Sequence, residues 1–214
     1  VVFVAGYPGR TARLNTVDNV RETVEFQLPR TVRRSTDLIA ILEKVGASDP
    51  EIALRVSTRI RSLNNGLTKN NGVLEGMLRG GLLEQKAAKE KALLAWIAAA
   101  PDRQQHYGNV IAAIGAIQSE RKPMRERDLL VNEVGATGSA LSAAETLHRL
   151  AIERAKPDAE RDPEYQQRLW PRLRESLERL QRNLDPKADR AVLAYNLAAI
   201  ARLPAGARIR ALDE

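Results

Sequence analysis

Hydrophobic residues recur at helical spacing along most of the chain. One apolar stripe consists of Leu38, Ile41, Leu42 and Val45, and a similar stripe near the other end consists of Val192, Leu193, Leu197 and Ile200. Proline and glycine interrupt this periodicity at intervals and divide the chain into separate segments. The pattern therefore predicts helices over residues 17–28, 33–45, 50–100, 101–120, 124–134, 137–156, 163–183 and 186–203.

Capping residues mark several of the expected helix ends. Thr16 carries a hydroxyl suited to an N-cap ahead of the first helix, and Pro29 is expected to stop that helix. The second helix is expected to end at Gly46. The sequence Ser48-Asp49-Pro50-Glu51 combines cap residues, a proline for the first turn and an acid for the positive end of the helix dipole. It predicts a strong helix start.

The chain opens with an apolar run of the β type, Val1–Ala5, followed by Gly6-Tyr7-Pro8-Gly9. Pro-Gly is a natural pair for the middle of a type II turn, because glycine accepts the positive φ that this turn requires. A solitary strand cannot pair its edges or bury both of its faces. We therefore expect the strand to be a remnant of a sheet whose other strands lie elsewhere in a longer protein.

The stretch from Arg55 to Gly81 is the most unusual part of the predicted helices. Asparagine and glycine are both poor helix formers, and each interior glycine costs about 1 kcal/mol relative to alanine. This stretch contains Asn64, Asn65, Asn70 and Asn71 together with Gly66, Gly72, Gly76, Gly80 and Gly81. Gly72, Gly76 and Gly80 share one face, where another backbone is expected to approach closely, and a bend is expected near Gly66 or Gly72. Either this is an imperfect helix with a tight crossing, or its amides have a binding role.

Composition favours helices packed on helices, because leucine, alanine, arginine and glutamate dominate and aromatic residues make up only 4% of the 214 residues. The formal net charge of +7 would suit nucleic acid, but the basic residues alternate with acidic ones, as is typical of solvated helix faces. We therefore expect no nucleic-acid partner. The chain has no cysteine and no apolar run long enough to span a membrane, and we expect no signal peptide within these residues.

No complete catalytic centre emerges from the residues themselves. His106 and His148 have no second metal ligand at helical spacing, and no serine lies in a nucleophile motif. The carboxylate pairs Glu22/Glu25 and Glu175/Glu178 lie beside arginines and are expected to form solvated ion pairs. Trp96 and Trp170 fall in apolar stripes and are expected in the core. No catalytic residue, cofactor or metal site is predicted.

Four segments together resemble bacterial dipeptidyl-peptidases 7 and 11, which are serine peptidases of family 46. The segments are FVAGYPGRTARL, SLNNGLTKNNGVLEGM, ERDPEYQQRLWPRLRESLERL and LPAGARI. The resemblance implies a mainly α fold: residues 1–15 would lead out of a chymotrypsin-like barrel, and residues 16–214 would form its α-helical cap domain. It further implies a catalytic triad outside this chain, a periplasmic location and a homodimer.

The resemblance also implies one site residue. In the family an asparagine of the helical cap binds the α-amino group of the peptide substrate, ahead of a lysine and a Gly-x-x-x-Gly pattern. Asn65, followed by Lys69, Gly72 and Gly76, matches this arrangement best, while Asn64 is displaced by one residue. An amide oxygen can accept a hydrogen bond from an ammonium group without the larger desolvation penalty of a buried carboxylate.

The sequence therefore favours the helical cap of a serine dipeptidyl-peptidase that recognises a peptide amino terminus and closes the cleft. The expected partners are the substrate peptide, the catalytic domain of the same polypeptide and a second copy of the chain. Two alternatives remain at this point: a non-catalytic helical interaction module and, with less support, a basic nucleic-acid-binding domain.

Overall fold

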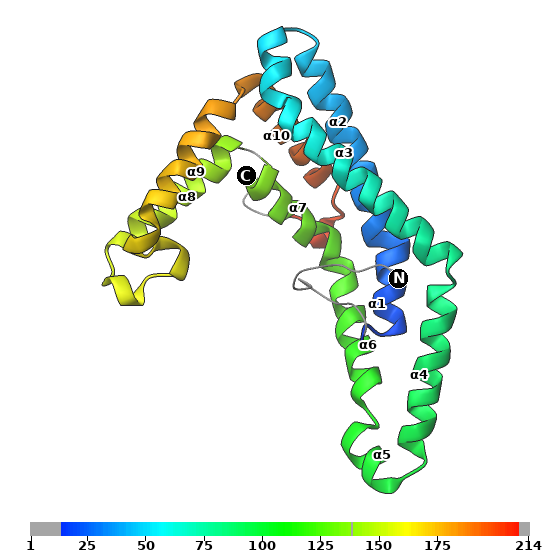
Figure 1. The fold of residues 1–214 in the computed structure, drawn as a ribbon. Helices are drawn as coiled ribbons and strands as arrows, with labels where there is room; N and C mark the ends of the chain where they lie inside the picture. Colours follow the sequence, from blue (N-terminus) through cyan, green and yellow to red (C-terminus); the bar gives the residue numbers. More distant parts are fainter. Residues whose placement is uncertain (1–13, 138, 210–214) are drawn as a thin grey trace, which may run out of the picture. The chain divides into compact units, whose positions relative to one another are not determined.

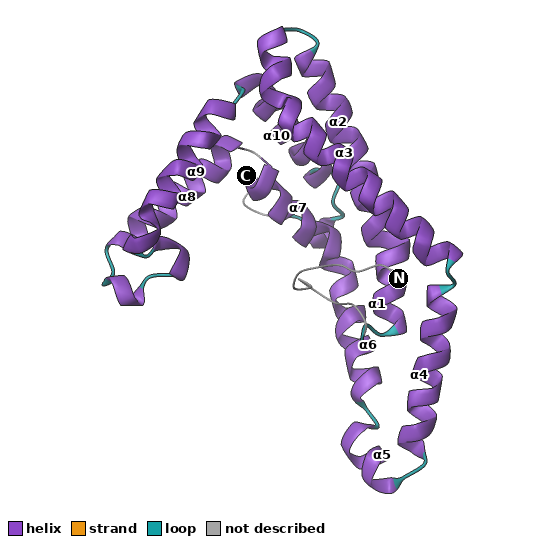
Figure 2. Ribbon diagram, viewed as in Figure 1, coloured by secondary structure: helices purple, strands orange, loops and turns teal. Residues whose placement is uncertain are grey.

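The computed structural model describes residues 14–137 and 139–209, and within them every regular element is helical (Figures 1 and 2). The α-helices are α1 (Val17–Glu22), α2 (Leu28–Gly46), α3 (Pro50–Arg79), α4 (Leu82–Ala98), α5 (Pro101–Tyr107), α6 (Val110–Arg121), α7 (Arg125–Thr137), α8 (Ser139–Arg154), α9 (Trp170–Asn183) and α10 (Pro186–Ile200). A π-helical segment spans Thr23–Gln27, and short 3₁₀ turns include Lys122–Met124, Asp158–Glu160, Pro163–Tyr165, Gln167–Leu169 and Ala205–Ala207. The mainly α prediction is confirmed. The expected strand over residues 1–5 and the turn after it lie outside the described residues.

The chain divides into two compact units. The first comprises Val1–Arg34 and Gly66–Glu120, and the second comprises Ser35–Asn65 and Arg121–Glu214. The boundaries fall within α2, within α3 and before the last residue of α6, so residues of these three helices belong to both units.

The core of the second unit forms where α2, α3 and α10 meet. Its buried side chains are Leu38, Leu42, Ile52, Val56, Ala188 and Val192. A hydrogen bond of 2.8 Å from the hydroxyl of Tyr195 to Oδ2 of Asp37 ties α10 to α2. A second cluster consists of Leu130, Ile200 and Leu203 and joins α7 to the end of α10. Burial of these apolar side chains is the main force holding the unit together.

Gly46 sets the close approach of α2 and α3. A Cβ atom at this position would lie 3.1 Å from Cα of Ala53 and 3.5 Å from Cγ2 of Val56. The helix end predicted at Gly46 is correct. Gly46 does not adopt the positive φ that often ends a helix at glycine. Glycine is favoured here because a side chain would collide with α3.

The first unit is organised around α1. The N–H of Val17 donates to Oε2 of Glu90 on α4 at 3.0 Å, and the ammonium of Lys86 donates to the carbonyl of Asn15 at 3.0 Å. The N-cap predicted at Thr16 is confirmed, because its hydroxyl accepts a 3.3 Å hydrogen bond from the N–H of Asn19.

Several predicted helix boundaries are wrong. The helix predicted over residues 101–120 is divided into α5 and α6 at Gly108 and Asn109. The helix predicted from residue 163 begins only at Trp170, as α9, because Gln166 is extended and lies between two 3₁₀ turns that precede it.

Pro29 does not stop the first helix, because α2 already begins at Leu28, directly after the π-helical segment. The N–H of Leu28 donates to the carbonyl of Thr23, five residues earlier. We attribute the tolerance of proline to this wider turn, which separates the ring from the carbonyl that it would meet in an α-helix.

The long helix predicted over residues 50–100 is broken at Gly80 and Gly81, and α3 is continuous through Gly66 and Gly72. Gly81 has a φ of 58°, a left-handed conformation that glycine adopts without steric cost. Two glycines in succession therefore interrupt this helix, whereas the single glycines Gly66, Gly72 and Gly76 lie within α3.

Candidate functional site

The asparagine-rich segment lies on α3, whose first half is anchored in the core of the second unit. The helix starts after Asp49, whose Oδ1 accepts a hydrogen bond of 2.8 Å from the N–H of Glu51. At helical spacing beyond this start, the apolar side chains Ile52, Val56, Ile60 and Leu63 pack in or against the core cluster. This packing explains why the segment is helical although poor helix formers follow.

Asn65 comes two residues after the last of these anchoring side chains. It is exposed, and its side-chain amide makes no hydrogen bond with another described residue. Asn64 and Asn71 are also exposed, and Asn70 is half-buried. The helix thus fixes the backbone of Asn65 and leaves its amide available to a ligand.

An open hollow of about 320 Å³ lies in the second unit, beside the part of α3 that precedes Asn65. Its lining consists of Arg55, Val56, Thr58, Arg59, Ser62, Asn183, Leu184, Asp185, Ala188 and Asp189. Thr58, Ser62 and Asn65 are spaced i, i+4, i+7, so Asn65 lies one turn beyond the hollow on the same face of the helix.

Two charged residues of the hollow are committed to structural contacts. Arg55 pairs with Glu51 at 2.5 Å and donates to the carbonyl of Leu184 at 3.3 Å. The carboxylate of Asp185 caps α10 by accepting a hydrogen bond of 2.9 Å from the N–H of Ala188. The contact from Arg55 to Leu184 holds the residue before α10 against α3, and the Asp185 cap fixes the first turn of α10.

The glycines of α3 do not mark a tight helix crossing in the described structure. A Cβ atom added at Gly66, Gly72 or Gly76 would meet no described atom of a neighbouring segment within 4 Å. At Gly80 it would meet only the carbonyl of Gly76 in the same helix, at 2.8 Å. Among the described residues, the predicted close approach at Gly72 and Gly76 is therefore wrong, and no described segment crowds the face that carries Asn65, Lys69 and these glycines.

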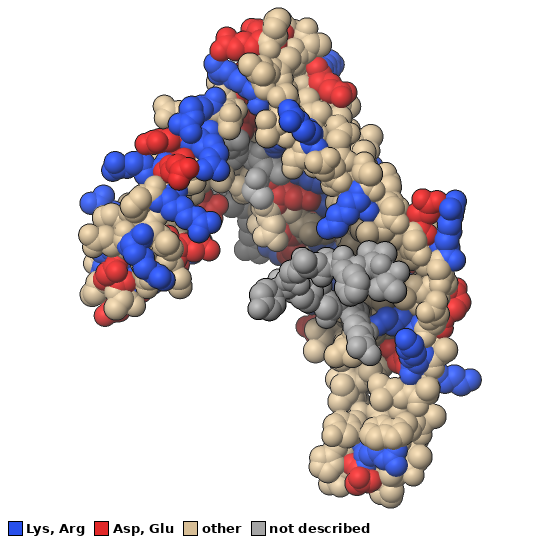
Figure 3. Space-filling view, viewed as in Figure 1, with Lys and Arg blue, Asp and Glu red and all other residues tan. Residues whose placement is uncertain are grey.

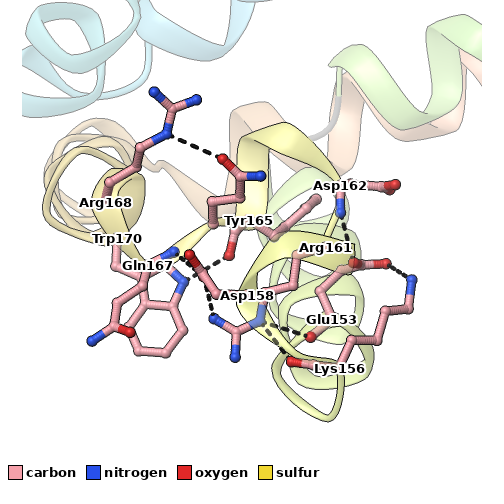
Figure 4. Close-up of polar contacts among 10 residues, drawn as sticks. Glu153, Lys156, Asp158, Arg161, Asp162, Tyr165, Gln167, Arg168 and Trp170 are labelled. Carbon is pink, nitrogen blue, oxygen red and sulfur yellow. Dashed lines mark hydrogen bonds and ion pairs between the residues drawn. The ribbon is translucent and has the colours of Figure 1, made fainter.

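The connection between α8 and α9 is held by a polar cluster around Glu153, which Figure 4 shows. Glu153 is buried, pairs with Lys156 at 2.6 Å and accepts a hydrogen bond of 2.9 Å from the N–H of Asp162. The hydrogen bond from Lys156, followed by the one from Asp162, holds the pKa of Glu153 below its usual value. Glu153 in turn raises the pKa of Lys156.

Arg161 and Trp170 complete this cluster (Figure 4). Nε of Arg161 donates to the carbonyls of Glu153 and Lys156 at 3.1 Å each, and Nη1 pairs with Asp158 at 2.7 Å. The indole N–H of Trp170 donates to the carbonyl of Tyr165 at 2.8 Å, and the guanidinium of Arg161 lies 5.3 Å from the ring centroid. The segment from Arg161 to Trp170 is therefore structural, since it satisfies the backbone of its own loop.

The remaining candidates are mostly surface features. His106 and His148 are exposed. Glu25 pairs with Arg21 and Glu175 pairs with Arg179, which confirms the solvated ion pairs expected for these two carboxylates. Trp170 is half-buried, but the core position predicted for Trp96 is wrong because this side chain is 52% exposed.

Two properties of the described residues bear on the site. The described residues contain no group of three or more histidine, cysteine, aspartate or glutamate side chains placed to hold a metal ion. None of the described helices combines the length and apolar character needed to cross a bilayer.

Comparison with known proteins places the chain in a family. A profile described as "Peptidase S46" matches residues 1–214. The chain belongs to the peptidase S46 family. An Asp/Glu-specific dipeptidyl-peptidase of Shewanella putrefaciens is 30% identical over 213 residues, which is 100% of this chain and 28% of that protein. The resemblance drawn from the sequence is thereby confirmed.

Two further S46 relatives match shorter parts of the chain. Dipeptidyl-peptidase 7 of Capnocytophaga gingivalis is 28% identical over 110 residues, covering 51% of this chain and 15% of the relative. An Asp/Glu-specific dipeptidyl-peptidase of Porphyromonas endodontalis is 28% identical over 94 residues, covering 44% of this chain and 13% of the relative. This S46 chain thus spans less than a third of the length of each relative.

The four segments that carried the S46 resemblance have different physical roles. SLNNGLTKNNGVLEGM forms most of the second half of α3, whereas the segment beginning at Glu160 stabilises the α8–α9 connection through Arg161. LPAGARI contributes Leu203 and Ala207 to the buried residues. Of FVAGYPGRTARL, the structure describes the last residue, Leu14, and the other residues of that segment lie outside the described residues. Sequence reasoning missed Glu153, although the polar, proline-flanked connection after it was visible.

Proposed function

We propose that this S46 chain is the α-helical cap of a serine dipeptidyl-peptidase, with residues 1–15 leading from a catalytic barrel and residues 16–214 forming the cap. The membership of the family and the names of the three relatives support this proposal. The catalytic triad belongs to the barrel of the same polypeptide, outside this chain. The enzyme acts in the periplasm as a homodimer.

Within this cap, Asn65 binds the α-amino group of the substrate peptide. The observation that carries this assignment is an exposed amide with no described hydrogen-bond partner on a helix whose preceding turns are anchored in a core. Preorganisation of this kind lowers the entropic penalty of binding, because the backbone of the anchor is already fixed. The oxygen of the amide accepts a hydrogen bond from the ammonium group, and the uncrowded face of α3 leaves space for the peptide terminus.

Anchoring the amino terminus explains how such an enzyme releases dipeptides. The α-amino group held at Asn65 fixes the distance from the peptide end to the catalytic serine, so the bond after the second residue reaches the nucleophile. The cap closes the cleft beyond this anchor and blocks the passage of a longer chain. An acylated terminus would leave the polar site unpaired and would be rejected.

The test is Asn65→Ala in the complete enzyme, measured with a chromogenic dipeptidyl substrate. Loss of one polar contact to a charged group should lower kcat/KM by about 1–3 kcal/mol, which corresponds to roughly 5- to 150-fold. Asn71→Ala is the matched control, because Asn71 is also exposed and lies six residues further, on another side of the same helix. An unchanged kcat/KM in Asn65→Ala would show that Asn65 is not the anchor.

A further inference from the structure

Helices α4, α5 and α6 of the first unit present large apolar side chains to solvent. Those exposed by 42–58% are Leu93, Leu94, Trp96, Tyr107, Val110 and Ile117, which we call the hairpin surface. Helix α6 has no buried residue, although its sequence VIAAIGAIQSER is mostly apolar. An apolar helix without a buried face is unusual for an exposed element and indicates a missing neighbour.

The core of the first unit is too small to account for this apolar content. Among its described residues, the buried hydrophobic side chains are Val20, Val24 and Ile97. Three buried side chains contribute little against the conformational entropy lost on ordering such a unit, since a fully buried aliphatic side chain stabilises by about 1.5–3 kcal/mol. The unit therefore needs further apolar burial.

The charge distribution defines what could cover the hairpin surface. Between Lys91 and Glu120 the only charged side chains are those of Asp102 and Arg103. The guanidinium of Arg103 lies 4.3 Å from the ring centroid of Trp96 and donates to the carbonyl of Trp96 at 2.6 Å, so this charge is engaged within the surface. Figure 3 shows this part of the first unit mainly in tan, with few charged groups. Apolar surfaces with so few charges are typical of permanent interfaces.

We propose that the hairpin surface packs permanently against the part of the same polypeptide that lies outside residues 1–214. This inference rests on the proposed function, in which the chain is one region of a longer peptidase. The Shewanella putrefaciens relative aligns with the whole chain over only 28% of its own length, which leaves a much larger part to supply an apolar partner. Covalent connection gives that part a high effective concentration at the hairpin surface.

Photo-cross-linking of the complete protein tests this assignment. Replacement of Ile117 by p-benzoylphenylalanine should give cross-links that leave the protein at its monomer mass and join position 117 to peptides outside residues 1–214. The same photoreactive residue at position 54 is the control, because Leu54 is 74% exposed on α3 in the second unit. A product of doubled mass would assign the surface to a second copy and overturn the proposal. Cross-links confined to residues 1–214, or no cross-link, would also overturn it.

A second measurement does not depend on photochemistry. In the complete protein, Ile117→Asp should weaken docking and accelerate tryptic cleavage after Arg103 by roughly tenfold, because cleavage follows the population of the undocked form. Leu54→Asp should leave this rate within about twofold, because Leu54 is exposed. Equal rates in the two variants would contradict the proposal. If the complete protein formed the expected intramolecular cross-links but had no dipeptidyl-peptidase activity, the proposed function would be refuted and the proposed interface would stand. Failure of the proposed function can therefore be distinguished from failure of the proposed interface.

Discussion

Glu153 and Lys156 form an ion pair of 2.6 Å in which the carboxylate side chain is only 7% exposed. The carboxylate also accepts the N–H of Asp162, so its charged form has two hydrogen-bond donors. This pair joins the last turn of α8 to the loop that leads to α9. The stability of the loop should therefore depend on the ionisation of Glu153.

Acid should weaken this connection. The pKa of Glu153 is lowered in the folded state, first by the hydrogen bond from Lys156. The contribution of Glu153 to the free energy of unfolding is therefore complete above the usual glutamate pKa of about 4.3, and it is lost as the pH falls through the lowered pKa. Glu153→Gln should reduce the free energy of unfolding at pH 7. Below pH 5 it should also reduce the slope of this free energy against pH, by the equivalent of up to about one bound proton. Urea unfolding at several pH values measures both effects.

Glu175→Gln is the control for this experiment, because the Arg179–Glu175 pair is exposed on both sides. Its pH dependence should remain close to that of the unchanged protein. If Glu153→Gln behaved in the same way as Glu175→Gln, the buried ion pair would have no role in stability.

Two substitutions of glycine by alanine should change the stability in opposite directions. Gly46→Ala places a methyl group 3.1 Å from Cα of Ala53, and because this neighbour is backbone, α2 and α3 must move apart. We expect a loss of about 1–2 kcal/mol. Gly66→Ala meets no described atom within 4 Å inside α3 and should gain about 0.5–1 kcal/mol from helix propensity. Urea midpoints compare the two variants, and a stabilising Gly46→Ala would contradict the close approach.

Leu42 should be among the most sensitive core positions, since it is fully buried where α2, α3 and α10 meet. Leu42→Ala should destabilise by about 2–5 kcal/mol through lost burial and an unfilled cavity. Leu54→Ala removes the same atoms from a side chain that is 74% exposed and should change stability by no more than about 0.5 kcal/mol. Similar losses in the two variants, measured by thermal unfolding, would refute the described core.

Discrimination against blocked peptides should depend on Asn65. The complete enzyme should process a peptide with a free amino terminus in preference to its N-acetylated form, because only the ammonium group pairs with the amide oxygen. In Asn65→Ala the ratio of kcat/KM for the free peptide to kcat/KM for the N-acetylated peptide should fall by roughly 5- to 150-fold. This factor corresponds to the loss of one contact of about 1–3 kcal/mol. A variant that lost activity equally on both substrates would have a structural defect instead of a recognition defect.

The 214-residue chain by itself should not hydrolyse a chromogenic dipeptidyl substrate, since the proposed triad lies outside it. The measurement is turnover by the purified chain against a blank. Turnover above the blank that co-purifies with the chain would refute the proposed division between cap and catalytic domain.

The sequence by itself determined the helical fold class and most helix starts. These features depend on local chemistry: the Thr16 hydroxyl caps its own helix, and Asp185 caps the helix that starts one residue later. The order of four short segments also determined the family, because a match of this kind needs no three-dimensional information. Asn65 was selected from its neighbours in the sequence, and its role as an anchor stays a prediction.

Only the tertiary structure decided where side chains are buried and where helices are interrupted. The predicted stripe of α10 included Leu197, which is 39% exposed, whereas Asn196 beside it is fully buried. Helical periodicity gives the spacing of a face, but packing against α2 and α3 selects the face that is buried. The role of Glu153 likewise required the loop to fold back over it, because its partner Asp162 is nine residues away. Contacts between residues that are distant in sequence are the information that local patterns do not contain.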